Sequence, residues 1–112
     1  MRLQALERFV AEASARLDPA EPQHLLERGR WEFAHALVAA DRRADALAQL
    51  DELVARHPGG RFPAAALQLK GQLLTEDGQF DLARDAWQRL LSQYPGFLFN
   101  DDVRDDLRRL PH

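Results

Sequence analysis

Apolar side chains recur every three or four positions along most of this sequence, a spacing that places them on one face of an α-helix. The pattern stops repeatedly at proline or glycine, because neither residue continues a helix without a cost in stability. Between these stops the periodicity predicts six helices joined by short connections, and therefore an all-α fold with antiparallel neighbours. The expected helical ranges are 2–18, 22–40, 43–57, 62–76, 79–94 and 100–110.

Composition supports this prediction and limits the partners. Ala and Leu dominate the apolar residues and isoleucine is absent, which favours helix over strand. The net charge of -3 is spread along the chain without a basic stripe, so nucleic acid is not an expected partner. No apolar run approaches the roughly 20 residues that a membrane span needs, and the N-terminus lacks the apolar core of a signal peptide. We expect a soluble protein, cytoplasmic as given or periplasmic if excised from a longer secreted chain.

The stop signals themselves repeat. Pro19, Pro58 and Pro95 lie 39 and 37 positions apart, close to the period of a helical-hairpin array. Before Pro95, large, small, turn and aromatic residues follow in a fixed order: Leu67, Gly71, Leu74, Gly78, Phe80, Ala83 and Trp87. This order resembles the tetratricopeptide repeat. An earlier copy is looser: it contains Phe33, Ala34, Leu37, Ala46 and Leu50, but Asp41 replaces the turn glycine and Arg30 the first large residue.

The resemblance implies a single domain, residues 1–112, in which helical hairpins stack as a short right-handed superhelix. Its parts would be an N-terminal helix over 1–18, hairpins over 22–58 and 62–95, and a C-terminal capping helix over 100–110. The long loop at 57–62 is also similar to repeats of bacterial envelope proteins, such as the periplasmic Tol-Pal coordinator and outer-membrane assembly lipoproteins. The alternative is a generic Ala/Leu-rich helical bundle.

In this family the first helix of each hairpin lines a concave groove that binds a partner. The resemblance therefore implies a partner-binding face at Arg28, Trp31, His35 and Val38 in the first hairpin, and at Ala65, Gln68, Gln72, Thr75 and Glu76 in the second. Helical spacing separates the first group from the apolar stripe of its own helix. Two alternatives stay open for Trp31: it anchors a partner, or the N-terminal helix covers it.

Catalytic and metal-binding patterns are missing from the sequence. Glu32 and His35 form one Glu-x-x-His pair, whereas a di-iron bundle needs two. No nucleophile elbow or phosphate-binding glycine loop is present. The acidic residues at 101–106 alternate with arginines and indicate a solvated helix face, with Asn100 as its N-cap. We therefore expect no enzyme activity, no cofactor and no metal.

These observations predict a scaffold that binds a peptide or helix of another protein. The alternative is a homo-oligomerisation module of a larger envelope protein, with a homodimer formed through the apolar stripe of the N-terminal helix. That stripe consists of Leu3, Leu6, Val10, Ala13 and Leu17. Such a stripe, or its counterpart near the C-terminus, would otherwise cap the repeats, which bury too little apolar surface when they stand alone.

Overall fold

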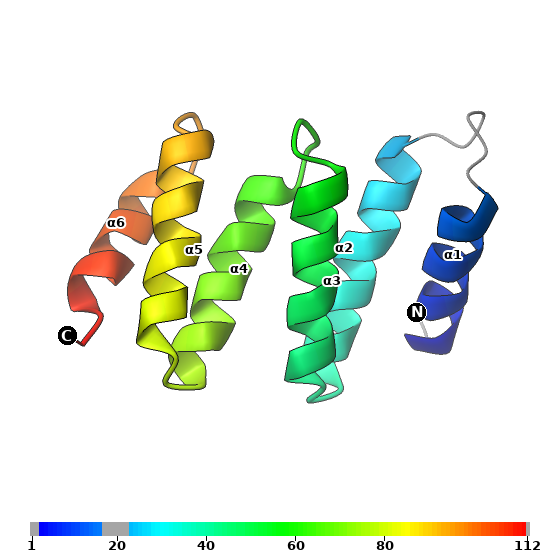
Figure 1. The fold of residues 1–112 in the computed structure, drawn as a ribbon, viewed down its shortest axis with the longest axis horizontal. Helices are drawn as coiled ribbons and strands as arrows, with labels where there is room; N and C mark the ends of the chain where they lie inside the picture. The colour runs from blue at the N-terminus through cyan, green and yellow to red at the C-terminus, as the bar shows by residue number, and fades with distance from the viewer. Residues whose placement is uncertain (1–2, 17–22, 112) are drawn as a thin grey trace. The chain divides into compact units, whose positions relative to one another are not determined.

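The computed structural model describes residues 3–16 and 23–111, and within those ranges it contains six α-helices and no strand. The helices are α1 (Leu3–Arg16), α2 (Gln23–Ala39), α3 (Arg43–Arg56), α4 (Pro63–Glu76), α5 (Phe80–Gln93) and α6 (Asn100–Arg109) (Figure 1). Each boundary lies within two residues of the one predicted from periodicity, which confirms an all-α helical repeat fold. The predicted stop at Asp18-Pro19 and the predicted start at Pro22 lie outside the described residues.

The chain divides into two compact units, Met1–Pro63 and Ala64–His112. In the first unit, α1 packs on α2 and α2 packs on α3. Leu6 and Val10 of α1 are 5% and 6% exposed, so these two members of the apolar stripe are already buried within the unit. The core continues through Ala34, Leu37, Ala46, Leu50 and Leu53, all of them buried.

The two hairpins, α2–α3 and α4–α5, close with the same backbone hydrogen bonds, displaced by 37 residues. Asp41 donates its N–H to the carbonyl oxygen of Val38, and Gly78 donates to that of Thr75, each at 3.0 Å. Both turn residues adopt left-handed backbone angles, with φ of 59° at Asp41 and 77° at Gly78. Asp41 therefore replaces the turn glycine of the repeat without changing the geometry of the turn, since aspartate is among the few non-glycine residues that tolerate this conformation.

In the second unit, the small residue of the repeat order lies at a close helix crossing. Gly71 of α4 lies directly against the indole of Trp87 of α5, where any Cβ would overlap the ring. The indole Nε1 donates a hydrogen bond of 3.1 Å to the carbonyl oxygen of Gln68. Ala83 is fully buried and Trp87 is 3% exposed, so the small and aromatic positions of the repeat order lie in the core of this unit.

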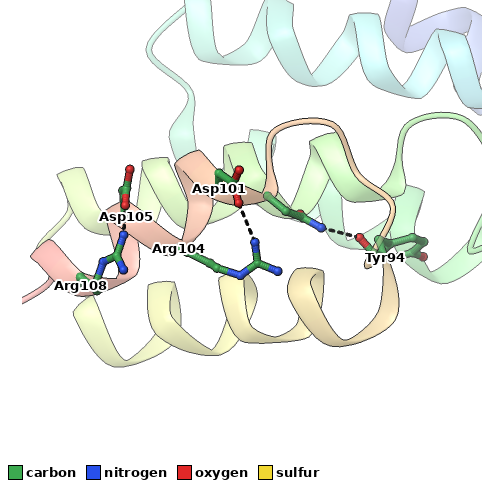
Figure 2. A network of polar contacts seen from close by, with 6 residues as sticks. Tyr94, Asp101, Arg104, Asp105 and Arg108 are labelled. Atoms are coloured by element: carbon green, nitrogen blue, oxygen red, sulfur yellow. Dashed lines mark hydrogen bonds and ion pairs between the residues drawn. The ribbon is translucent and has the colours of Figure 1, made fainter.

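Helix α6 packs on α5 and begins at Asn100, the first residue of the expected range. Phe99 is the N-cap, so the prediction that Asn100 caps the helix with its side chain is wrong. The buried Asn100 amide instead donates a 2.9 Å hydrogen bond back to the carbonyl oxygen of Tyr94, which closes the preceding loop. Figure 2 shows this bond together with the ion pairs Asp101–Arg104 and Asp105–Arg108 along the helix, as expected for a solvated face.

Candidate binding hollow

The first unit contains an open hollow of about 960 Å³ beside α2. Three of the predicted site residues, Arg28, Trp31 and His35, line it together. They share it because positions 28, 31 and 35 fall on one helical face, as their spacing predicted. The remaining lining residues come from α1, from other positions on α2 and from the loop after α3: Leu6, His24, Leu25, Glu27, Glu32, Ala36, Arg61 and Phe62.

A cluster of aromatic rings forms the centre of this hollow. The Phe62 ring stacks on the Trp31 indole, with ring centroids 5.2 Å apart and planes 9° from parallel. The His35 ring meets the indole edge-on at 4.4 Å. Trp31 is consequently half-buried, and its stacking partner comes from the loop before α4 and not from the N-terminal helix. Neither alternative for Trp31 described the arrangement fully.

Charged side chains surround the aromatic rings. Arg28 forms an ion pair of 3.0 Å with Glu32, and its side chain is 69% exposed. The guanidinium carbon of Arg61 lies 5.7 Å from the centre of the Phe62 ring, within the range of a cation–π contact. The exposed ion pair between Arg28 and Glu32 adds little to stability, since water screens it. These side chains are available to orient a ligand.

The buried carboxylate of Glu27, a residue that lines the hollow, accepts hydrogen bonds from the loop that carries Phe62. One oxygen accepts the backbone N–H of Arg61 at 3.0 Å, and the other accepts that of Phe62 at 2.9 Å. Glu27 is only 3% exposed, and a Cβ at Gly60 would overlap its carboxylate. The carboxylate charge is thereby stabilised by two backbone amides.

Two further polar residues are buried in the same unit. Arg30 is 3% exposed and His57 is 6% exposed. Burial lowers the pKa of the His57 imidazole from its ordinary value of 6.5; the charge of Glu27 opposes this shift, and those of Arg30 and Arg56 add to it. Burial also lowers the pKa of the Arg30 guanidinium, and the neighbouring charge of Arg56 lowers it further.

The site residues predicted in the second hairpin lie elsewhere. Gln72, Thr75 and Glu76 line a smaller hollow of about 290 Å³ in the second unit. The other lining residues of that hollow are Trp87, Asp106, Arg109, Leu110 and Pro111. Thr75 donates its hydroxyl to the carbonyl oxygen of Gly71 at 2.7 Å. Ala65, Gln68 and Val38 line neither hollow, and all three are half-buried.

Comparison with known proteins finds a similarity for the second hairpin. Residues 65–96 match the model of the tetratricopeptide repeat, over 32 of the 112 residues. This segment, most of the second hairpin, is similar to a tetratricopeptide repeat. No curated protein matches it significantly. The search of solved structures likewise gave no significant match.

The offset between the two hairpin turns shows which residues are particular to the first hairpin. The matched turns are 37 residues apart, so position 31 corresponds to position 68, and position 27 to position 64. The second hairpin has Gln68 where the first has Trp31, and Ala64 where the first has Glu27. Sequence reasoning missed Glu27. The signal for it was an acidic residue at the position that corresponds to a buried alanine in the second hairpin.

Within residues 3–16 and 23–111, no group of three or more histidine, cysteine, aspartate or glutamate side chains could hold a metal ion. In those same ranges, none of the helices combines the length and the apolar character that crossing a membrane requires.

Proposed function

We propose that this chain is a non-catalytic scaffold that binds a peptide or helix of a partner protein in the hollow beside α2. Tetratricopeptide repeats generally mediate protein–protein interactions, and this supports a protein as the partner. The observation that carries the proposal is the stack of Phe62 on Trp31, accessible from an open hollow. Half-exposed aromatic side chains with arginine beside them are typical anchors of protein interfaces.

Within the proposed surface, each residue type has a distinct role. Trp31 and Phe62 offer apolar area that is already ordered, which lowers the entropic cost of binding. Arg28 and His35 offer hydrogen-bond donors at the edge of this area. Gln72 and Thr75 would form a second, smaller contact surface in the second unit. For Val38 and Gln68 a binding role stays a prediction from the family alone.

The experiment is affinity capture from a lysate of the source organism, with the retained proteins identified by mass spectrometry. We expect Trp31→Ala and Arg28→Gln to lose the proteins that the wild type retains. Arg104→Gln is the matched control, because it also removes an arginine from an exposed i,i+3 or i,i+4 ion pair but lies on α6, outside this hollow. If all four proteins retain the same partners, the hollow is not the binding surface.

Homo-oligomerisation stays a prediction, as does an envelope location. Because Leu6 and Val10 are buried within the first unit, a homodimer through α1 would have to use other residues or displace that helix. Light scattering at several protein concentrations separates the two functions. A constant monomer mass supports the scaffold, whereas a mass that doubles with concentration supports self-assembly.

A further inference from the structure

One side chain, that of Glu27, forms hydrogen bonds to the backbone of the loop between α3 and α4. The two oxygens of the Glu27 carboxylate each accept a backbone N–H, from Arg61 and from Phe62, at 3.0 and 2.9 Å. Arg61 and Phe62 lie 34 and 35 positions after Glu27 in the sequence, so the bonds are tertiary contacts and not part of a local turn. Since the second bond fixes the backbone of Phe62 itself, the carboxylate also sets where that ring lies.

Gly60 makes this approach possible. A Cβ at position 60 would overlap the Glu27 carboxylate, whereas a Cβ at the neighbouring Gly59 would meet no heavy atom within 4 Å. Neither glycine has a left-handed backbone angle. A β-carbon at position 60 would therefore displace the Glu27 carboxylate from its present place.

The fold does not require this arrangement, because the second hairpin closes its corresponding loop without it. The N–H of Gly60 bonds to the carbonyl oxygen of His57 at 3.0 Å, and 37 residues later Phe97 makes the same bond to Tyr94 at 3.1 Å. Alanine replaces the glutamate there, at position 64. Phe99, the residue that corresponds to Phe62, is 48% exposed. The first hairpin thus has additional hydrogen bonds, those of Glu27, to the loop that carries the Phe62 ring.

We propose that Glu27 and Gly60 are positioning residues of the binding surface: the buried carboxylate fixes loop 57–62 so that Phe62 stacks on Trp31. This inference rests on the proposed function for its biological meaning, and it makes the loop part of the recognition surface. Glu27 is deeply buried, and both of its carboxylate oxygens already accept a backbone N–H. A partner would have to displace those two backbone amides in order to bind the carboxylate. It acts through the loop.

The test follows the environment of Trp31 in the intact chain labelled with 5-fluorotryptophan. Fluorine NMR gives one resonance for Trp31 and one for Trp87, assigned with a Trp31→Phe variant. We expect Gly60→Ala and Glu27→Gln to shift the Trp31 resonance and to leave that of Trp87 in place. Gly59→Ala is the matched control and should shift neither resonance, because its methyl group meets open space.

A purely structural role for Glu27 would lower the melting temperature without moving the Trp31 resonance of the folded protein. An unmoved resonance in Glu27→Gln overturns the inference, and so does an equal shift in Gly59→Ala. If Gly60→Ala fails to fold, Glu27→Gln decides alone, since it keeps the size of the side chain and one acceptor oxygen. Combining Glu27→Ala with Gly60→Ala should move the resonance no further than Glu27→Ala does, because the overlapping group is gone.

Binding provides a second, separate readout. For a partner whose retention depends on Trp31, we expect Gly60→Ala to weaken binding about tenfold, as expected when a preformed surface loses its order. Gly59→Ala should bind like the wild type. If no retained protein depends on Trp31, the proposed function fails while the NMR result still stands. If binding survives a shifted resonance, the loop is positioned by Glu27 but lies outside the recognition surface, and this inference is wrong.

Discussion

Gly71 lies so close to the indole of Trp87 that no β-carbon fits between them. In an exposed helix, replacing glycine by a residue with a side chain stabilises by up to about 1 kcal/mol. At this crossing the overlap outweighs that gain, so we expect Gly71→Leu to lower the free energy of unfolding by roughly 1–3 kcal/mol or more. Urea denaturation measures it. Gly96→Ala, whose β-carbon meets nothing within 4 Å, is the control and should not be destabilised.

Truncation of Trp87 should be the most damaging single change in the second unit. The side chain is 3% exposed, and its Nε1 satisfies the carbonyl oxygen of Gln68. We expect Trp87→Ala to cost about 3–5 kcal/mol through the cavity it leaves. Trp87→Phe keeps most of the volume and should cost less, about 1–3 kcal/mol, mainly through the lost hydrogen bond. Equal losses in the two variants would show that the lost hydrogen bond, and not the cavity, carries the cost.

The two hairpin turns give opposite predictions for similar substitutions. Asp41 and Gly78 share a left-handed backbone. Gly78→Ala should lower the free energy of unfolding by about 1 kcal/mol, because a β-carbon is disfavoured there. Asp41→Gly should be neutral or stabilising by a few tenths of a kcal/mol, since relief of the backbone strain is offset by a more flexible unfolded chain. Thermal melts of both variants check this, and a strongly destabilised Asp41→Gly would contradict it.

Stability of the first unit should fall on mild acidification. Burial lowers the pKa of His57 below 6.5, so the folded state binds its proton less readily than the unfolded state. The neutral imidazole therefore contributes fully above pH 6.5, and this contribution is lost as the pH falls from there towards the folded pKa. Urea unfolding between about pH 7.5 and pH 5 measures the slope. His57→Gln should flatten it; an unchanged slope would exclude His57 as the cause.

Much of this fold could be predicted because its determinants are local. Helix ends follow from proline and glycine, and the crossing of Gly71 with Trp87 follows from a repeat order that is visible in the sequence. The turn at Asp41 kept its geometry although its residue departs from the pattern. In each case the residues that decide the structure lie within one hairpin.

The contacts that sequence reasoning missed join residues far apart. Glu27 looked like one more charge on a helix, and Gly60 looked like a simple helix break, yet they meet across more than thirty positions. Helical periodicity does not report such pairs, because it describes one helix at a time. Likewise, the spacing brought Arg28, Trp31 and His35 onto one face, but it could not show that Phe62 would complete the surface.

The shared hydrogen bonds of the two turns have a practical meaning for how such a protein changes over time. Each connector satisfies its own main-chain groups, whatever side chains the adjoining helices display. The two hairpins therefore keep the same turn although they differ at half-buried positions, with tryptophan at position 31 and glutamine at position 68. A new binding specificity can arise from a few substitutions on the helices, while the backbone hydrogen bonds of the turns stay the same.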